Sequence, residues 1–437
     1  MPIPDPPYPG LLDEQLAAMA VAAARAEPLR SPHAGAPQAV GASVTSAVER
    51  LRGDLVALSH DVHAHPELGY EEHHAVAAVA ALLRRHGHEP EVGAYGLPTA
   101  LRARAGTGRP TVAVLAEYDA LPELGHACGH NVICATAVGA FLAAAEALDG
   151  IDGCVELIGT PAEEGGGGKE LIARAGGFDA VDAAVMLHPA GFEVAEHAWI
   201  GVRRVDVTYT GLAAHASAMP FLGRNALDAA VNAYQAMAQL RQHMLPTDRI
   251  HGVITDGGQK PNIVPERAAL SFYLRSATPE TLAVLAERAE QIFAAAAQMA
   301  GVGVDVAWDP TPVYLPVRNN HTLALRWATN MAERGRVALP QGVIPEAMTG
   351  STDLGNVSVR VPAMHPTVAI APPGVAIHSP EFARYAVSEE ADRAVVDGAI
   401  GLALTALDYL SDSELRTAVT AEFEVAGGRL DVEALLP

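Results

Sequence analysis

The chain has 437 residues, half of them hydrophobic, which is more than one hydrophobic core usually accommodates. We therefore expect two folded, soluble domains. The 29 basic and 51 acidic side chains give a formal net charge of -22. Because this charge repels nucleic-acid phosphates and anionic lipid surfaces, we expect no nucleic-acid partner and no membrane partner.

The cysteine content and the N-terminus indicate the compartment. Of Cys128, Cys134 and Cys154, at least one is left unpaired, which argues against a disulfide scaffold and favours a reducing environment. The opening residues carry acidic groups and prolines where a secretory signal would carry basic ones, and the apolar helix expected over 131–145 is too short to span a bilayer. We expect a cytoplasmic protein.

Residues 1–43 are rich in Pro and Ala and predict an N-terminal extension. One short helix is expected over 11–27, and a linker-like stretch follows it. Such an extension either packs on the surface or remains mobile.

A catalytic domain is predicted to begin at residue 44, and its first part extends to residue 199. Two helical patterns, 43–66 and 71–87, precede the continuous apolar run 111–116, which suits a strand buried on both faces. Helices then alternate with apolar strands at 154–160 and 183–188. This alternation predicts an α/β domain with a doubly wound, mostly parallel sheet.

The pattern changes over residues 200–311, which predict an inserted domain. A half-exposed strand at 202–211 precedes a helix capped by Asn225, with Leu227, Val231, Tyr234 and Ala238 on one face. Two strands, a helix that ends at Gly301 and a last strand follow. This order predicts a smaller ferredoxin-like α+β domain that serves as a lid or dimerisation domain, and residues 312–437 complete the catalytic domain.

Reactive side chains follow the predicted strands of the catalytic domain, where ligands bind in doubly wound sheets. The strand 111–116 precedes Glu117, Asp119 and the stretch HACGHN, and the next strand precedes PAEEGGGG. The other strand ends supply His188 and His378. Thiolate, imidazole and carboxylate together suit zinc or a similar ion, and the candidate ligands are Cys128, His130, Glu164, His188 and His378.

Each candidate also has an ordinary structural interpretation. Cys128 alone would be a small buried hydrophobe, Glu164 a solvated loop acid, and the two histidines backbone hydrogen-bonding partners. The stretch HDVHAHPELGYEEHH reads as a helix end, a turn and a helix start. The glycine run is not a phosphate loop, because Glu163 and Glu170 stand where that motif needs Gly and Ser or Thr.

Several spaced motifs together resemble the two-metal amidohydrolases and peptidases of the aminoacylase and carboxypeptidase G family. The chain looks most like the branch of indole-acetyl-amino-acid hydrolases and aminobenzoyl-glutamate hydrolases, which includes dipeptidase-like members. The motifs cover about residues 45–410: HAHPELGYEE, EYDALPELGHACGHN, GTPAEEGG, LHP, GLAAHAS, PNIVPERA, GSTDLGNVS and HSPEF.

The resemblance implies hydrolysis of an amide bond in an N-acyl amino acid, an aminobenzoyl-glutamate-like compound or a dipeptide. It implies two divalent ions per subunit, zinc or manganese with cobalt or nickel as alternatives, held by the five candidate ligands, with Glu163 as general base. Asp119 would orient a ligand. Within the inserted domain, His215 and Asn262 would hold the carbonyl oxygen, the His often from a partner subunit in a homodimer. Arg275, Ser351 and Asp353 are the remaining candidates, for binding substrate.

The sequence also departs from the wider family and leaves one alternative function open. Glu117 stands where much of that family has a metal-binding His, so the metal set depends on the Cys-Gly-His motif. Five ligands are few for two ions, which favours a bridging Cys128 thiolate or a bridging hydroxide. GSTDLGNVS is equally consistent with a well-capped turn. The alternative to an enzyme is a non-catalytic, metal-binding relative that binds small molecules.

Overall fold

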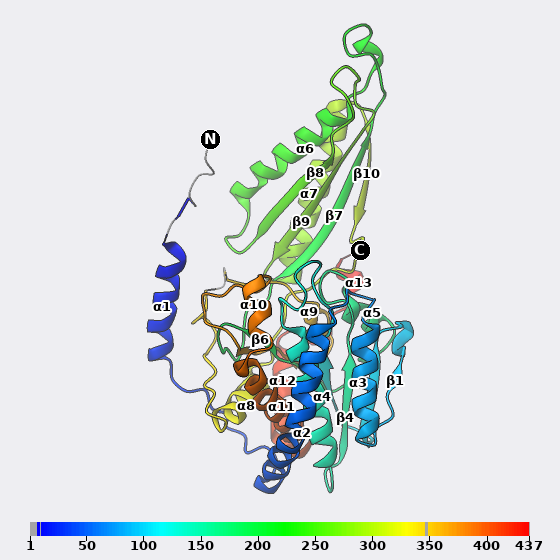
Figure 1. Cartoon of the computed structure of the whole chain (residues 1–437). Coiled ribbons are helices and arrows are strands. Elements are labelled where there is room, and N and C mark those ends of the chain that lie inside the picture. The colour runs from blue at the N-terminus through cyan, green and yellow to red at the C-terminus, as the bar shows by residue number, and fades with distance from the viewer. Residues whose placement is uncertain (1–6, 9, 346–347, 437) are drawn as a thin grey trace. The chain divides into compact units, whose positions relative to one another are not determined.

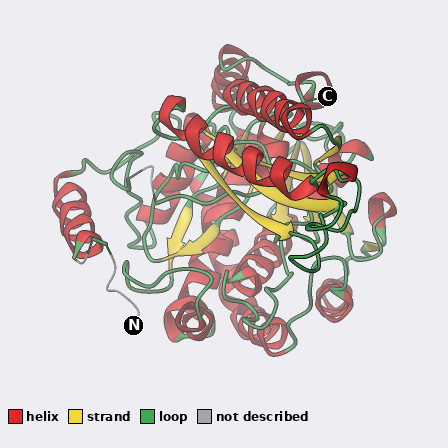
Figure 2. Cartoon of the chain, turned by 90° about the horizontal axis from the view of Figure 1, so that it is seen from above, coloured by secondary structure: helices red, strands yellow, loops and turns green. Residues whose placement is uncertain are grey.

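The computed structural model of the chain describes residues 7–8, 10–345 and 348–436. It divides into two compact units. Unit 1 comprises Met1–Ala198, Val317–Thr349 and Asn356–Leu430, and unit 2 comprises Trp199–Pro316, Gly350–Gly355 and Asp431–Pro437. Residues 1–6 and 9 of the predicted extension lie outside the described residues. Both units mix helices with strands (Figure 2).

Unit 1 is built on a six-stranded sheet with the order β1-β2-β4-β3-β5-β11. The four strands from β4 to β11 run parallel, and β1 and β2 form an antiparallel edge. The predicted α/β fold with a mostly parallel sheet is confirmed. The strands are β1 (Glu91–Val92), β2 (Leu101–Thr107), β3 (Thr111–Ala116), β4 (Gly153–Gly159), β5 (Ala183–Val185) and β11 (Ala363–Met364).

Two strand predictions need correction. The predicted strand 183–188 breaks after Val185, and its end belongs to β6 (His188–Ala190). β6 pairs in parallel with β12 (Thr367–Ala369) in a separate two-stranded sheet, so the strand that precedes the predicted ligand His378 does not join the main sheet. The break at Met186–Leu187 directs His188 away from the main sheet.

Helices cover the sheets of unit 1 (Figure 1). α2 begins directly after Pro37, earlier than the predicted Ser43. The helices of unit 1, with α9 at its boundary, are α1 (Leu11–Arg25), α2 (Gln38–Ala64), α3 (His73–Arg85), α4 (His130–Glu146), α5 (Gly168–Arg174), α8 (His321–Ala332), α9 (Leu354–Ser358), α10 (Pro380–Tyr385), α11 (Glu389–Ser411) and α12 (Ser413–Val425).

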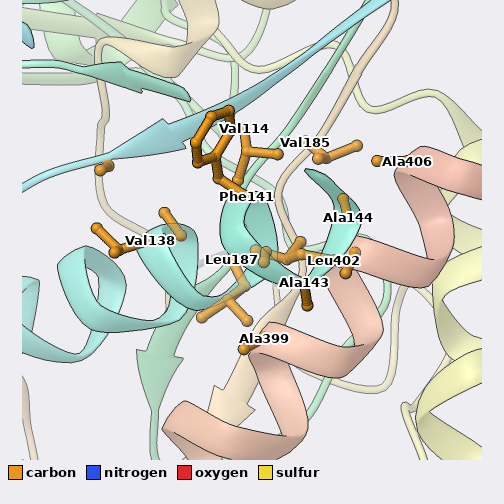
Figure 3. Packing of buried hydrophobic residues seen from close by; sticks show 14 of the residues in the cluster. Val114, Val138, Phe141, Ala143, Ala144, Val185, Leu187, Ala399, Leu402 and Ala406 are labelled. Carbon is orange, nitrogen blue, oxygen red and sulfur yellow. The ribbon is translucent and has the colours of Figure 1, made fainter. Parts of the chain in front are cut away.

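The core of unit 1 surrounds α4, which is buried from its first residue to Ala144. Figure 3 shows Phe141 of α4 beside Val114 of β3, with Ala399 and Leu402 of α11 near Leu187. α4 packs between α2 and α11. A helix hydrophobic all round is expected at such a central position.

The described part of the N-terminal extension packs against unit 1. Met19 of α1 is buried with Val194 and Ile344 in a small apolar cluster. Further along, the amide of Ala36 donates to the Asp408 carboxylate over 2.7 Å. These contacts favour the packed alternative over the mobile one.

Among the described helices, α11 alone is long and apolar enough to cross a membrane by length and composition. Of its most apolar stretch, 89% is buried inside the fold, where it forms part of the core around α4.

Unit 2 contains a four-stranded antiparallel sheet with the order β10-β7-β9-β8. α6 and α7 pack on each other and on β9. This order and the strand-helix-strand-strand-helix-strand sequence are those of the predicted ferredoxin-like fold. The elements are β7 (Gly201–Thr210), α6 (Ala226–Leu240), β8 (Arg249–Asp256), β9 (Arg267–Ser276), α7 (Pro279–Ala300), β10 (Gly303–Trp308) and α13 (Val432–Leu435).

The predicted caps of unit 2 are confirmed, but one helix face is not. Asn225 accepts a hydrogen bond from the Leu227 amide, and Gly301 ends α7 in a left-handed conformation. The predicted apolar face of α6 is not the buried one, since Val231 is 43% exposed. α6 instead buries its small side chains together with Met237 and Leu240: Ala226, Ala229, Ala230 and Ala233. Alanine side chains are small, so they let the helix approach its neighbours closely. The prediction relied on the larger apolar residues of the helix and therefore overlooked the alanines as its buried face.

Candidate metal centre

Two parallel strands bring the acidic residues of the candidate site together. β3 and β4 end side by side, with Ala116 opposite Gly159. Asp119 therefore lies beside the loop after β4, and its Oδ2 accepts a hydrogen bond from the Glu164 amide over 2.9 Å. This contact fixes the position of the Glu163–Glu164 pair.

The Cys-Gly-His motif needs its glycine. Gly129 has a φ of 82° and immediately precedes α4, whose first residue is His130. A Cβ at Gly129 would lie 2.5 Å from Cγ of Pro189. Only glycine satisfies both conditions, because a left-handed conformation and this close approach exclude a side chain. The turn thereby directs Cys128 and His130 into the same cluster.

The structure brings all five predicted ligands and the predicted base into one cluster. Three overlapping groups each offer ligand atoms within 4.8 Å of one another. These groups are Cys128 with His130 and His188, Cys128 with Glu164 and His378, and His130 with Glu163 and Glu164. Cys128, His130 and Glu164 each belong to two of these groups, so the three groups form one continuous cluster. Whether these residues ligate a metal stays a prediction.

Individual distances define this cluster further. The Sγ atom of Cys128 lies 3.4 Å from Nε2 of His188, and Nε2 of His378 lies 3.3 Å from Oε1 of Glu164. His378 adopts a φ of 61°, and its amide donates to the carbonyl of Ala127, which ties its loop to the Cys-Gly-His turn.

The polar atoms of the cluster fit a metal. Nδ1 of His130 contacts the carbonyl oxygen and Oδ1 of Asp119, at 2.9 and 3.1 Å. This arrangement orients Nε2 of His130 into the cluster, where it is buried without a hydrogen-bond partner, as is Oε1 of Glu164. Buried polar atoms without partners are costly, and a cation would satisfy both. A carboxylate behind a ligating imidazole is the usual supporting partner of such sites.

Burial sets the protonation of the other ligands. It lowers the pKa of His188 to about 3, so that this ring is neutral, the form that ligates metals. Burial also raises the pKa of the Cys128 thiol. Burial alone would raise the pKa of Asp119, but the charge and hydrogen bond of His130 outweigh it and the net shift is downward.

Glu117 has a partner that the sequence pattern did not indicate. Lys169, at the start of α5, forms an ion pair with Oε1 of Glu117, and both side chains are fully buried. Oε2 of Glu117 lies 3.5 Å from Nε2 of His130. The lysine therefore balances an acidic residue beside the predicted metal ligands, at the position where the wider family was expected to have a His.

The turn HPELGYEE also supports the site, although its sequence pattern indicated no such role. The fully buried Glu72 accepts a hydrogen bond from the amide of Ala162 over 2.8 Å. Ala162 precedes Glu163 and has an unusual φ of 57°. The hydroxyl of Tyr70 donates to the carbonyl of Gly166. The sequence contained one signal of this role: two adjacent acidic residues, Glu71 and Glu72, stand just before a helix with an apolar face.

In unit 2, His215 and Asn262 lie on neighbouring segments. The amide of Ala216 donates to the carbonyl of Asn262, and the exposed His215 ring accepts from the amide of Ala218 through Nδ1. An isolated antiparallel β-bridge joins His215 to Ile263, the residue after Asn262. The structure therefore places the two predicted residues close to each other.

The three predicted substrate residues also lie in unit 2. Arg275 donates from Nη1 to the hydroxyl of Ser351 over 2.6 Å, and burial lowers the pKa of Arg275. Asp353 is fully buried. The structure thus brings Arg275 and Ser351 together.

Known proteins resemble this chain over nearly all its length. The Xaa-Arg dipeptidase of Mus musculus is 39% identical over 410 residues, which cover 90% of this chain and 92% of the relative. One of the two p-aminobenzoyl-glutamate hydrolase subunits of Escherichia coli is 32% identical over 297 residues, which cover 63% of this chain and 62% of the relative. Residues 200–299 match the peptidase dimerisation domain.

A solved structure shows the same fold. A dinuclear metal-binding peptidase of the M20 family from Bacillus subtilis aligns with a TM-score of 0.64 and 19% identity, covering 83% of this chain and 99% of that one. The fold and these relatives define a metal-dependent hydrolase of amide bonds. The chain belongs to the M20 family of peptidases and amidohydrolases, and the resemblance seen in the sequence is confirmed.

Proposed function

We propose that this enzyme hydrolyses dipeptides whose C-terminal residue is basic, using two divalent ions held by Cys128, His130, Glu164, His188 and His378. The observation that carries the metal part is the buried donor cluster, in which Nε2 of His130 and Oε1 of Glu164 have no hydrogen-bond partner. The substrate part is supported by the 39% identity to the Xaa-Arg dipeptidase. The formal charge of -22 favours a cationic substrate over an acidic one.

Zinc is the proposed metal, with manganese as the second choice. One thiol and three imidazoles favour a borderline ion over a hard one such as magnesium. When bound, the ions supply Lewis-acid chemistry, which polarises the amide carbonyl and makes a water molecule more acidic. Cys128, His130 and Glu164 each belong to two of the three ligand groups, so they would hold the ions together with His188 and His378.

Glu163 is the proposed general base. It belongs to the cluster, where its Oε2 lies 3.9 Å from Nε2 of His130. It would accept a proton from the attacking water and deliver it to the leaving amine, as the same carboxylate can act first as base and then as acid. Asp119 keeps the His130 ring oriented through Nδ1. Glu72 holds the backbone just before Glu163 through the Ala162 amide.

Residues of the dimerisation domain complete the proposal. His215 and Asn262 would donate hydrogen bonds to the carbonyl oxygen as negative charge develops there. Arg275 and Ser351 would bind the carboxylate of the substrate, since a guanidinium matches carboxylate geometry. We propose a homodimer through residues 200–299 and a reducing, cytoplasmic location, which would keep the Cys128 thiol available for ligation.

A substrate panel tests this proposal. Release of free amino acid would be measured at defined zinc or manganese loading for four substrate types. These are dipeptides ending in Arg or Lys, the same dipeptides ending in Glu, p-aminobenzoyl-glutamate and indole-acetyl-aspartate. The proposal predicts the highest kcat/KM for the basic dipeptides. Faster hydrolysis of the acidic compounds would overturn the substrate assignment, and no hydrolysis at full metal loading would favour the non-catalytic alternative.

A further inference from the structure

A second group of possible metal ligands lies at the corner between α2 and α3. Asp61 lies in the last turn of α2, and His65, the residue that directly follows α2, contacts its carboxylate. The turn that follows returns the chain, so that His74, at the second position of α3, faces the same carboxylate. From its sequence pattern, this histidine-rich stretch was expected to be purely structural.

The geometry of these three side chains suits a small cation. Nε2 of His74 lies 2.9 Å from Oδ2 of Asp61. Nδ1 of His65 lies 3.3 Å from Oδ1 of Asp61 and 2.9 Å from its backbone carbonyl oxygen, which leaves Nε2 of His65 as the second ring nitrogen for an ion. One ligand atom from each residue lies within 4.8 Å of the others. Ligand atoms of a tetrahedral zinc site are about 3.3 Å apart, given metal-ligand distances of about 2.0–2.1 Å. The trio is therefore close to the spacing that a shared ion requires.

An ordinary surface ion pair explains this arrangement less well. The rings of His65 and His74 are tilted by 31° with centroids 4.1 Å apart, so two protonated rings would repel each other. Two neutral imidazoles with one carboxylate are a ligand set for zinc. The side chains remain 54%, 41% and 40% exposed for His65, Asp61 and His74, which leaves room for water in the fourth position.

A histidine at the other end of α3 shows the contrast. His86, which follows the last residue of α3, lies 3.1 Å from the carboxylate of Asp54. Arg85 contacts that same carboxylate and already neutralises it. This group contains no second imidazole and includes a fixed positive charge, so it is an ordinary surface pair.

We propose that Asp61, His65 and His74 form a further divalent-metal site, best suited to zinc, that fastens the end of α2 to the start of α3. The turn between them contacts the loops of the candidate metal centre. The carbonyl of Glu67 accepts from the amide of Ala120, next to Asp119. A Cβ added to Gly69 would lie 2.8 Å from Cβ of Ala162. An ion at this corner would therefore stabilise a turn on which the catalytic loops rest.

Zinc stoichiometry tests the proposal on the full-length protein. After dialysis against buffered micromolar free zinc, bound metal would be measured by elemental analysis for wild type, the double variant His65→Gln/His74→Gln, and the control His86→Gln. Wild type and the control should each bind one zinc per chain more than the double variant. Equal zinc content in all three would overturn the proposal.

Two features keep this test independent of the proposed function. All three proteins share the Cys128 cluster, so failure of that cluster to bind metal would lower every value and leave the difference unchanged. Asp61→Asn serves as a second variant should the double variant fold poorly, and it should also lose one zinc.

Amide exchange gives a second readout. With free zinc at ten times its dissociation constant, exchange of the amides over 65–75 should slow about tenfold in wild type, if the opening that exposes them releases the ion. The double variant should show no zinc dependence there. Zinc-independent exchange in wild type would contradict the role in fastening the corner.

Discussion

Replacing Lys169 by methionine should destabilise the protein strongly, because it leaves the buried carboxylate of Glu117 without its cation. Both side chains have no exposed surface. Removing one partner of a buried ion pair typically costs about 3–5 kcal/mol. A second route gives a similar value: an ordinary glutamate has a pKa of about 4.3, so keeping it protonated at pH 7 costs about 4 kcal/mol.

The second route also predicts a pH dependence. Protonation of Glu117 becomes easier as the pH falls, so the cost of Lys169→Met should shrink to about 1 kcal/mol at pH 5. The double variant Glu117→Gln/Lys169→Met removes both charges. It should recover most of the loss, since neutral replacements of a buried pair are often well tolerated.

Urea unfolding followed by circular dichroism measures these free energies. The proteins would be stripped of metal by a chelator, so that a bound cation cannot replace the lysine. The four proteins of the cycle give the coupling energy between Glu117 and Lys169. A loss below about 1 kcal/mol for Lys169→Met at pH 7, well under the range for a buried pair, would refute the reasoning. So would single-variant losses that simply add in the double variant.

Three further predictions concern the turn, a buried histidine and the dimerisation domain. Gly129→Ala should lower the unfolding free energy by about 2–4 kcal/mol and also lower metal affinity, because backbone strain adds to a clash with Pro189. Gly165 is also left-handed but lies in open space, so the control Gly165→Ala should show the cost of the strain alone. Burial lowers the pKa of His197 to about 4. As the pH falls below about 6.5, the unfolded chain therefore binds a proton at this residue before the folded protein does. The free energy of unfolding should decrease by about 2 kcal/mol at pH 5. His197→Gln should flatten this slope in urea titrations, and exposed His243→Gln should not. His215→Ala should retain its metal while kcat falls about 10² to 10³-fold; unchanged kcat would remove His215 from the mechanism.

The strands that hold the site were predictable because burial on both faces leaves a clear sequence pattern. The runs at 111–116 and 154–160 contain little but apolar residues, and the structure has β3 and β4 there. The strand β2, which lies between β1 and β4, was missed because its sequence LRARAGT mixes basic and small residues and is only partly buried. Such a strand lacks the two-sided burial on which the prediction depended.

The candidate site was largely predictable because its ligands follow strand ends and sit in compact motifs. Cys128, His130 and Glu164 come from two such motifs, and the structure brings them together. The Glu117–Lys169 pair was not predictable, since a lysine at a helix start normally points to solvent. Its burial accompanies an ion pair with Glu117, a residue far away in the sequence, and no local pattern encodes such a contact.

The corner of Asp61, His65 and His74 was missed for a related reason. The spacing of Asp61 and His65 was visible in the sequence, but the return of His74 depends on the turn over 65–72. That turn is fixed by contacts with distant residues, such as the hydrogen bond from the Ala120 amide to Glu67. Proximity of this kind becomes visible only in the folded chain.

The most direct test of the metal-hydrolase mechanism compares wild type with Glu163→Gln. The control is Glu123→Gln, which changes an exposed glutamate in the loop between β3 and α4. Metal content and kcat on the best substrate of the panel would be measured on the same samples. We predict unchanged metal content in all three and a kcat that falls about 10² to 10⁴-fold only in Glu163→Gln. A Glu163→Gln protein that keeps both its metal and a kcat within a few-fold of wild type would contradict the account.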